Sequence, residues 1–153
     1  MGGAGKEKKP EFGFGVHLIL DGYGCDKSSL EDISLIYNFL DKYPSQMDMT
    51  KIMPPYVFRY SGAVPEDWCV SGFVLIAESH ISIHTFPEKS YISVDMFSCK
   101  PFDTDVALET LKQYFQMQKC DVKVIDRGQE FPNTIRESAQ VVRMDRMLKQ
   151  RSR

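Results

Sequence analysis

Alternating apolar and polar positions recur in short segments of this chain, and a period of two predicts β-strands. In the first such segment, 15–23, the apolar residues Val16, Leu18 and Leu20 stand at every second position. Similar alternation, or a short apolar run bounded by turn residues, predicts further strands at 56–60, 70–77, 81–86, 91–97 and 121–125. Between them, the composition of 61–67 predicts a loop and that of 87–90 predicts a turn.

Two longer segments carry apolar residues at the spacing of a helix that covers a core. The first follows the capping-box pattern Ser28–Glu31, and Pro44 is expected to end it. Its predicted inward face consists of Ile33, Ile36, Tyr37 and Leu40. The second helix is expected at 103–119, with an inward face of Val106, Ala107, Leu111 and Phe115.

The order of these elements (strand, helix, three or four adjacent strands, helix, strand) predicts an α+β fold. We expect a two-layer sandwich in which the helices pack on one face of an antiparallel sheet, leaving the other face free for a partner or a site. Residues 1–11 are expected to be a flexible leader, 12–130 one domain and 131–153 a basic C-terminal tail. The tail is interpreted as a solvated segment; the alternative is a helix that docks onto an acidic surface.

Composition narrows the classes of function. The chain has 153 residues, with 19 basic and 21 acidic side chains and a formal net charge of -2. This balance argues against nucleic acid as a partner, because binding phosphates requires an excess of Lys and Arg. No apolar run approaches the roughly 20 residues that cross a bilayer, so no membrane contact is expected. Four cysteines without a C-x-x-C pair, in a chain with no export signal, predict free thiols and a cytoplasmic protein.

The segment 70–88 is the richest in reactive side chains, with two His, three Ser and two Glu among strand-forming residues. Composition alone favours a pair of strands with one polar side. A zinc site of His80, His84 and Cys99 is disfavoured, because four residues along a strand separate the two imidazoles too widely for shared ligation. A nucleophilic Ser–His pair is also disfavoured, since no G-x-S-x-G elbow is present.

The run ESHISIHTFPE at 78–88 closely resembles the processing site of the bacterial and archaeal S-adenosylmethionine decarboxylases. Other stretches match in the same order, namely GVH at 15–17, YGCD at 23–26, VSG at 70–72 and DMFSC at 95–99. An ordered match over roughly 14–127 is more specific than one short motif. The resemblance implies a self-processing proenzyme that acts on a small amino-acid substrate.

In that family the proenzyme cuts its own backbone. By the resemblance, the Ser79 hydroxyl attacks the carbonyl of Glu78 to form an ester, and elimination then leaves a pyruvoyl group in place of Ser79. The carbonyl of this group forms a Schiff base with the substrate amine and takes up the electrons of decarboxylation, a role that no ordinary side chain fills. The implied cofactor is therefore the pyruvoyl group made from Ser79, with no metal.

The resemblance also implies roles for three other residues. His84 is the base that takes the α-proton of Ser79, Ser71 stabilises the processing oxyanion, and Cys99 returns a proton to the substrate. In a straight strand Ser79 and His84 point to opposite faces. We therefore expect a bulge or bend near 80–82.

Substrate choice depends on the segment before Val70. The aromatic plates for an adenine or a sulfonium are expected to be Phe58, Tyr60, Trp68 and Phe86. Glu88 is expected to bind the ribose hydroxyls. The loop acids Glu66 and Asp67 have two interpretations, solvated charges or partners for a guanidinium or a terminal ammonium. S-adenosylmethionine is the expected substrate, and arginine or ornithine is the alternative.

The leading hypothesis is a pyruvoyl-dependent carboxy-lyase that supplies the aminopropyl donor for spermidine, and hence polyamine, synthesis. A homodimer of cleaved protomers is implied by the resemblance, because the short family members place the active site at the subunit interface. The competing hypothesis is an unprocessed homologue that regulates or binds a partner. The presence of all four residues Ser71, Ser79, His84 and Cys99 argues against it.

Overall fold

The computed structural model describes residues 13–130. The expected leader, 1–11, and the expected tail, 131–153, lie outside the described residues. Val16–Ile125 forms one compact unit, and the described residues 13–15 and 126–130 belong to a second unit. Within the second unit, the backbone N–H of Phe14 donates to the carbonyl of Arg127 at 2.6 Å.

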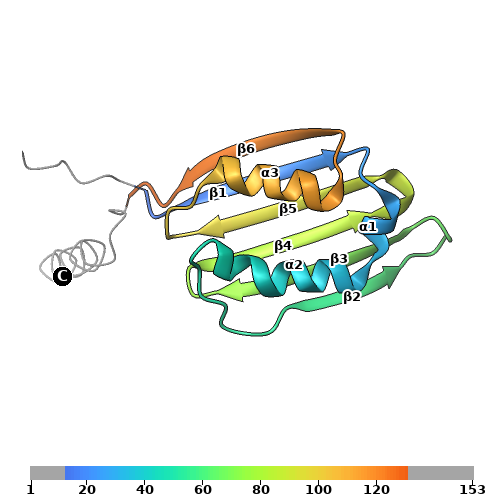
Figure 1. The fold of residues 1–153 in the computed structure, drawn as a ribbon, viewed down its shortest axis with the longest axis horizontal. Helices are drawn as coiled ribbons and strands as arrows, with labels where there is room; N and C mark the ends of the chain where they lie inside the picture. Colours follow the sequence, from blue (N-terminus) through green and yellow to red (C-terminus); the bar gives the residue numbers. More distant parts are fainter. Residues whose placement is uncertain (1–12, 131–153) are drawn as a thin grey trace, which may run out of the picture. The chain divides into compact units, whose positions relative to one another are not determined.

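The predicted strands are present and form one antiparallel sheet in the order β2-β3-β4-β5-β1-β6 (Figure 1). Their bounds are β1 Gly15–Tyr23, β2 Tyr56–Ser61, β3 Trp68–Ile76, β4 Ser79–Phe86, β5 Tyr91–Ser98 and β6 Lys119–Arg127. β3 and β4 form a tight hairpin, and β4 pairs on its other side with β5. The α+β prediction is thus confirmed, and β4 is a central strand with neighbours on both sides.

Three helices pack against this sheet, and a single 3-10 turn connects β4 to β5 as predicted. Their bounds are α1 Lys27–Glu31, α2 Ile33–Gln46, α3 Thr104–Phe115 and η1 Pro87–Lys89. The predicted capping box is wrong, because Asp26 rather than Ser28 begins α1, its carboxylate accepting from the Ser29 N–H at 3.0 Å. Asp32 begins α2 in the same way, through the Leu35 N–H at 3.0 Å.

The predicted helix ends are each off by a few residues. Pro44 lies inside α2, which continues to Gln46, because a proline in the last turn removes only one helical N–H donor. α3 ends at Phe115, before the expected 119, since Gln116 takes the left-handed φ of 48° that closes a helix. Lys119 already belongs to β6.

The core lies between the sheet and the helices. The predicted inward residues that are buried are Ile36, Leu40, Ala107, Leu111 and Phe115. Those that are instead exposed are Ile33, Tyr37 and Val106, at 42%, 38% and 58%. On both α2 and α3 the buried stripe is therefore rotated slightly from the predicted one.

Gly72 in the middle of β3 allows the close approach of α2. A Cβ at this position would lie 2.9 Å from Cδ1 of Leu40 and 2.9 Å from Cγ2 of Val57. Those distances are shorter than van der Waals contact, so any larger residue would push the helix away from the sheet. The glycine therefore lets α2 pack closely on β3, the strand that carries Ser71.

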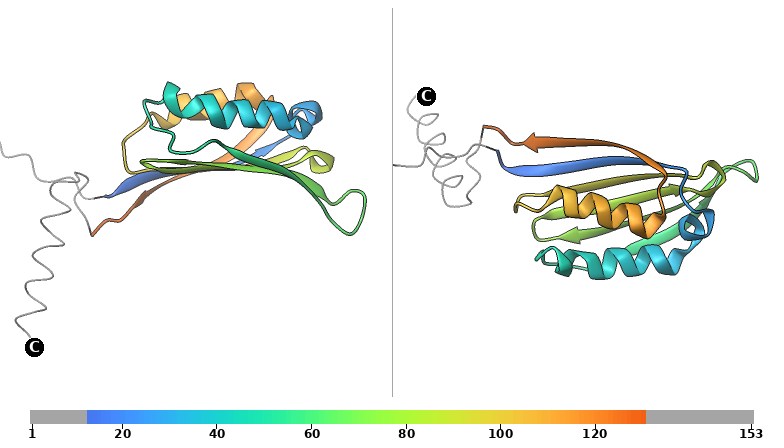
Figure 2. Two further views of the ribbon diagram at one scale, coloured as in Figure 1. Left: turned by 90° about the horizontal axis from the view of Figure 1, so that it is seen from below. Right: turned by 45° about the horizontal axis from the view of Figure 1, so that its top comes forward.

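No described element covers the sheet face opposite the helices (Figure 2). On β2, β3 and β4 this open face consists of Tyr56, Phe58, Tyr60, Cys69, Ser71, Phe73, Leu75, His80, Ser82, His84 and Phe86. The expected irregularity near 80–82 is wrong, because β4 pairs without interruption with β3 from Ser79 to Thr85 and with β5 from Ser79 to Phe86. The backbone is irregular only where the strand begins, at Ser79.

Candidate functional site

The bond between Glu78 and Ser79 lies where the β3–β4 hairpin turns. Ala77 and Glu78 form the two-residue turn, and Ser79 pairs directly with Ile76 as the first residue of β4. Ser79 has a φ of 148°, in a region that residues with a side chain rarely adopt. Conformations of this kind cost about 1–3 kcal/mol and persist only where the surroundings hold them in place. The predicted scissile bond is therefore a site of local backbone strain.

Neighbouring segments hold this turn through its backbone and its carboxylate. The N–H of Cys99 donates to the carbonyl oxygen of Glu78 at 2.8 Å. The N–H of Thr50 donates to Oε2 of Glu78 at 3.0 Å, and the Thr50 carbonyl accepts from Ala77 at 2.8 Å. The structure thus brings Glu78, Ser79 and Cys99 together at one end of β4, which we call the cleavage end.

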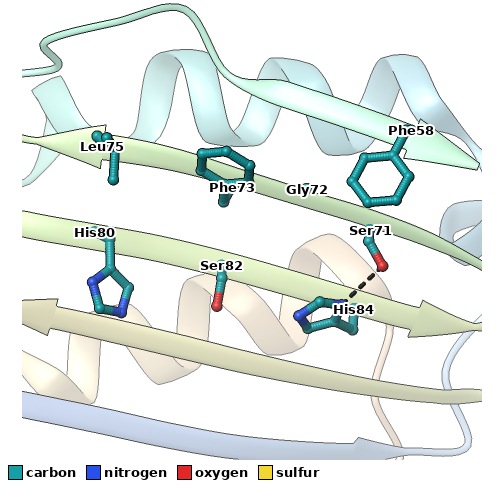
Figure 3. Close-up of a pocket in the computed structure, with 8 residues that line it drawn as sticks. All are labelled: Phe58, Ser71, Gly72, Phe73, Leu75, His80, Ser82 and His84. Carbon is teal, nitrogen blue, oxygen red and sulfur yellow. Dashed lines mark hydrogen bonds between the residues drawn. The ribbon is translucent and has the colours of Figure 1, made fainter.

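Ser71 and His84 form a second group on the open face (Figure 3). They are directly opposite in the β3–β4 ladder, and Ser71 Oγ lies 2.8 Å from His84 Nδ1. Ser71 is only 5% exposed, whereas His84 is exposed on the open face. In this Ser71–His84 pair, the hydroxyl can fix the orientation of the imidazole, and the imidazole can act as a base.

A concave region of about 400 Å³ extends from the Ser71–His84 pair across β2, β3 and β4. Figure 3 shows aromatic and aliphatic side chains on one side of it and polar side chains of β4 on the other. Its lining residues are Phe58, Ser71, Gly72, Phe73, Leu75, His80, Ser82 and His84. Apolar walls with a few convergent polar groups are typical of small-molecule sites.

Within one chain, the cleavage end and the Ser71–His84 pair are far apart. Ser79 begins β4, His84 is five residues further along the same unbroken strand, and at the usual rise per residue this separates them by roughly 16 Å. A direct proton transfer needs the two groups within hydrogen-bond distance. One copy of this chain therefore does not bring all four predicted catalytic residues together.

The predicted substrate-binding residues divide between the two faces of the sheet. Phe58, Tyr60 and Phe86 lie on the open face, with Phe58 directly across from Ser71 in the β2–β3 ladder. Trp68 lies on the other face, where it is 9% exposed and belongs to the core under the helices. Its indole N–H donates to Glu88 Oε1 at 3.2 Å.

Glu88 is already paired with residues on the helix side of the sheet. Its Oε1 accepts from Lys27 Nζ at 2.8 Å as well as from Trp68, and these two hydrogen bonds lower the pKa of the Glu88 carboxyl. Arg59 further covers the Trp68 ring, with its guanidinium carbon 3.9 Å from the ring centroid. Trp68 and Glu88 thus stabilise the junction of α1, β3 and η1 and do not line the concave region.

Glu66 and Asp67 lie in the exposed loop that connects β2 to β3. The loop is closed by its own backbone, through hydrogen bonds from Gly62 to the Asp67 carbonyl and from the Asp67 N–H to the Val64 carbonyl. The structure does not bring either carboxylate into the concave region.

Near the cleavage end, His17 and His80 form a cluster to which the sequence predictions gave no role. His17 Nε2 lies 3.0 Å from Asp95 Oδ1, and its ring is 6.5 Å from that of His80 and 5.7 Å from that of Phe97. The sequence predictions also gave no role to Cys69, whose Sγ lies 3.6 Å from Ser71 Oγ. Strand parity was the available signal, because residues two apart, such as Cys69 and Ser71, share one face.

The sequence profile of the S-adenosylmethionine decarboxylase family matches residues 16–128. The chain belongs to this family. The match extends from Val16 in β1 past the end of β6, so it covers both the cleavage end and the Ser71–His84 pair. The resemblance drawn from the motifs alone is confirmed.

Individual members of the decarboxylase family are similar to this chain over about three quarters of its length. An S-adenosylmethionine decarboxylase proenzyme of Clostridium botulinum (strain Langeland) is 37% identical over 115 residues, covering 74% of this chain and 94% of its own. The corresponding proenzyme of Pyrococcus horikoshii is 33% identical over 117 residues, covering 76% and 80%. The crystal structure of the adenosylmethionine decarboxylase from Aquifex aeolicus VF5 superposes with a TM-score of 0.63 at 29% identity, covering 76% and 92%.

All four cysteines, Cys25, Cys69, Cys99 and Cys120, are free thiols as predicted. None of the helices described between residues 13 and 130 has the length and apolar character needed to cross a membrane.

Proposed function

We propose that this member of the S-adenosylmethionine decarboxylase family is a proenzyme that cuts its own backbone between Glu78 and Ser79. The processed chain decarboxylates S-adenosylmethionine, and the product serves as the aminopropyl donor for spermidine synthesis. The observation that carries the proposal is the strained Ser79 beside a Glu78 carbonyl that already accepts an N–H donor. Four free thiols support a reducing, cytoplasmic location.

In the first step, the Ser79 hydroxyl oxygen attacks the carbonyl carbon of Glu78. A C–O ester bond replaces the C–N peptide bond, and the Ser79 nitrogen becomes a free amine. Negative charge develops on the Glu78 oxygen, the atom to which the Cys99 N–H donates at 2.8 Å. Opening the peptide bond also releases the unfavourable φ of Ser79, so ground-state strain favours this step.

In the second step, a base removes the α-proton of Ser79. The C–H electrons form a Cα=Cβ double bond, the Cβ–O ester bond breaks, and Glu78 leaves as a carboxylate. Water then replaces the nitrogen of the remaining enamine, releasing ammonia and leaving the pyruvoyl carbonyl. We assign the base to His84, which Ser71 holds through a 2.8 Å hydrogen bond. The oxyanion role expected for Ser71 is assigned in this proposal to the Cys99 N–H, which already donates to the Glu78 oxygen.

Because about 16 Å of β4 separates His84 from Ser79 in one chain, we propose that His84 and Ser71 act on Ser79 of a second copy. In a two-fold dimer, contacts are reciprocal, so two complete sites form from two half-sites. The open face is suited to this contact, since Tyr56 and Phe58 remain 58% and 41% exposed in the single chain.

The pyruvoyl group, once formed, supplies a carbonyl that condenses with the substrate amine and accepts the electrons of decarboxylation. Cys99 stays at the cleavage end, where its thiol returns a proton to the substrate α-carbon. Phe58 and Phe86 on the open face are the aromatic plates we assign to the adenine. We leave Trp68 and Glu88 out of this set, because both are engaged on the helix side of the sheet.

The first test is the mass of the purified chain. We expect two fragments, 1–78 and 79–153, the second bearing a carbonyl that reacts with hydrazine. Ser79→Ala should stay intact, and Ser82→Ala, a matched serine on the same strand, should be cut like wild type. An intact wild-type chain would refute the proposed processing.

The dimer has a separate test by complementation. Ser79→Ala and His84→Ala chains, each expressed alone, should both remain uncut. Coexpressed with different tags, they should give cleavage of the His84→Ala chain only, because its Ser79 receives His84 from the partner. Cleavage of neither chain, while wild type is processed, would mean that the base does not come from a second copy.

A further inference from the structure

The Ser71–His84 pair extends to a third residue, Cys69. Cys69 and Ser71 are two apart on β3 and therefore share the open face. The Cys69 Sγ lies 3.6 Å from Ser71 Oγ, and Ser71 Oγ lies 2.8 Å from His84 Nδ1. These three side chains form a chain of hydrogen bonds, with Ser71 in the middle and 5% exposed.

The direction of this hydrogen-bond chain decides what His84 can do. If the Ser71 hydroxyl donates to Nδ1, the neutral imidazole carries its proton on Nε2 and cannot accept another there. If Nδ1–H donates to Ser71, then Nε2 is free to accept a proton, and the Ser71 hydroxyl proton needs a different acceptor. Cys69 Sγ is positioned to be that acceptor.

We propose that Cys69 is a positioning residue for self-processing, which holds the Ser71 hydroxyl so that His84 stays in the tautomer with a free Nε2. This inference rests on the proposed function, because it assigns a role within the elimination step. Nε2 takes the α-proton of Ser79 of the second copy, the ester Cβ–O bond there breaks, and the imidazolium keeps donating Nδ1–H to Ser71 of its own chain. Cys69 itself exchanges no proton with the substrate.

The experiment compares Cys69→Ser, Cys69→Val and Cys69→Ala with wild type in freshly purified chains. Serine keeps a hydrogen-bond acceptor, whereas valine keeps comparable volume on a β-strand without one. We expect Cys69→Ser to process within about twofold of wild type, and Cys69→Val and Cys69→Ala to process about three- to tenfold more slowly, the effect of one modest hydrogen bond.

A second readout identifies the step that is slowed. If only the elimination is impaired, the valine and alanine variants should accumulate the ester, which hydroxylamine cleaves between residues 78 and 79. A misfolded chain would not reach the ester and would not be cleaved. Equal rates for Cys69→Val and Cys69→Ser, or slow variants without ester, would overturn the role of Cys69 while leaving the proposed function intact. An uncut wild-type chain would instead overturn the proposed function itself.

Discussion

The carbonyl oxygen of Glu78 accepts a hydrogen bond of 2.8 Å from the backbone N–H of Cys99. Cys99 follows Ser98, which is the residue paired with Ser79 across the β4–β5 ladder. The end of β5 therefore presents two different groups to the cleavage end. Its amide donates to the Glu78 carbonyl, where we propose the attack, and its thiol belongs to the residue next to the Ser98 that pairs with Ser79.

Because the amide and the thiol of Cys99 have different proposed roles, the variant Cys99→Ala should impair decarboxylation and leave chain cleavage intact. The substitution keeps the backbone N–H and so keeps the hydrogen bond to Glu78, and chain cleavage should proceed at close to the wild-type rate. Loss of the thiol removes the proposed general acid, and carbon dioxide release should fall by about 10²- to 10⁴-fold. Fragment analysis and release of labelled carbon dioxide measure the two effects. Full decarboxylase activity in the cut variant would exclude Cys99 as the proton donor.

The φ of 148° at Ser79 predicts an unusual stability effect. Glycine adopts positive φ readily, so uncut Ser79→Gly should be more stable than uncut Ser79→Ala by about 1–3 kcal/mol. Urea unfolding of both variants measures the difference.

Ser82, three residues further along β4 in regular strand, gives the matched control. In the uncut Ser79→Ala background, Ser82→Gly should be less stable than Ser82→Ala by roughly 0.5–1 kcal/mol, because glycine weakens a strand interior. The same sign at both positions would mean that Ser79 is not strained.

Most of the sheet could be predicted from the sequence because its signal is local. The alternation of apolar residues from Val16 to Leu20 and the Gly and Pro punctuation between strands needed no knowledge of the rest of the fold. The first strand was predicted to its end residues, Gly15–Tyr23. Its partner β5 was predicted to within one residue.

Helix boundaries and helix faces were less predictable, because capping groups compete. Asp26 and Ser28 are both suitable N-caps, but in the structure the Ser28 hydroxyl donates to the Asp26 carboxylate, and Asp26 caps the helix. Similarly, Val106 and Ala107 are adjacent apolar residues, and only the packing of α3 on the sheet decides that Ala107 is buried.

The candidate site was predictable as a set of residues but not as an arrangement. The motif contains Ser79 and His84, and the spacing of five was correctly seen as an obstacle to direct contact. Only the unbroken β4 ladder excludes the expected bulge and points to a second copy. Trp68 was wrongly assigned to the substrate site because the predicted strand began at residue 70. β3 begins at Trp68 itself, which places Trp68 on the same face as Val70.

Tyr91 should give a distinct titration in the alkaline range. Burial, and then the Asp21 carboxylate that accepts its hydroxyl at 2.5 Å, raise the pKa of Tyr91 from 10.0 to about 12. Because the folded pKa is above the unfolded one, the stabilising effect of the protonated phenol is complete below pH 10 and is lost as pH rises through 12.

The variant Tyr91→Phe should therefore be less stable than wild type at neutral pH, with a difference that shrinks as the solution is made more alkaline. Urea unfolding at several pH values measures this. The difference in ultraviolet absorbance between wild type and Tyr91→Phe should show one phenol titrating near pH 12. A phenol that titrates with the solvent-exposed tyrosines would contradict the partly buried Tyr91–Asp21 contact.

Substrate choice is the last prediction, and it depends on the loop that carries Glu66 and Asp67. Both carboxylates lie outside the concave region, in an exposed loop closed by its own backbone. A guanidinium or ammonium substrate would need at least one of them desolvated and within hydrogen-bond distance. We therefore expect processed protein to release carbon dioxide from S-adenosylmethionine, with no release from arginine or ornithine assayed side by side.

The double variant Glu66→Gln/Asp67→Asn tests whether these two carboxylates take part in substrate binding. Exposed charges contribute little to binding, so KM for S-adenosylmethionine should change by no more than about twofold. Phe58→Ala is the contrasting variant, since Phe58 lies across from Ser71 in the concave region, and loss of one aromatic stack should raise KM by about tenfold. Loss of activity in the double variant with no effect of Phe58→Ala would place the substrate against the loop instead of on the open face.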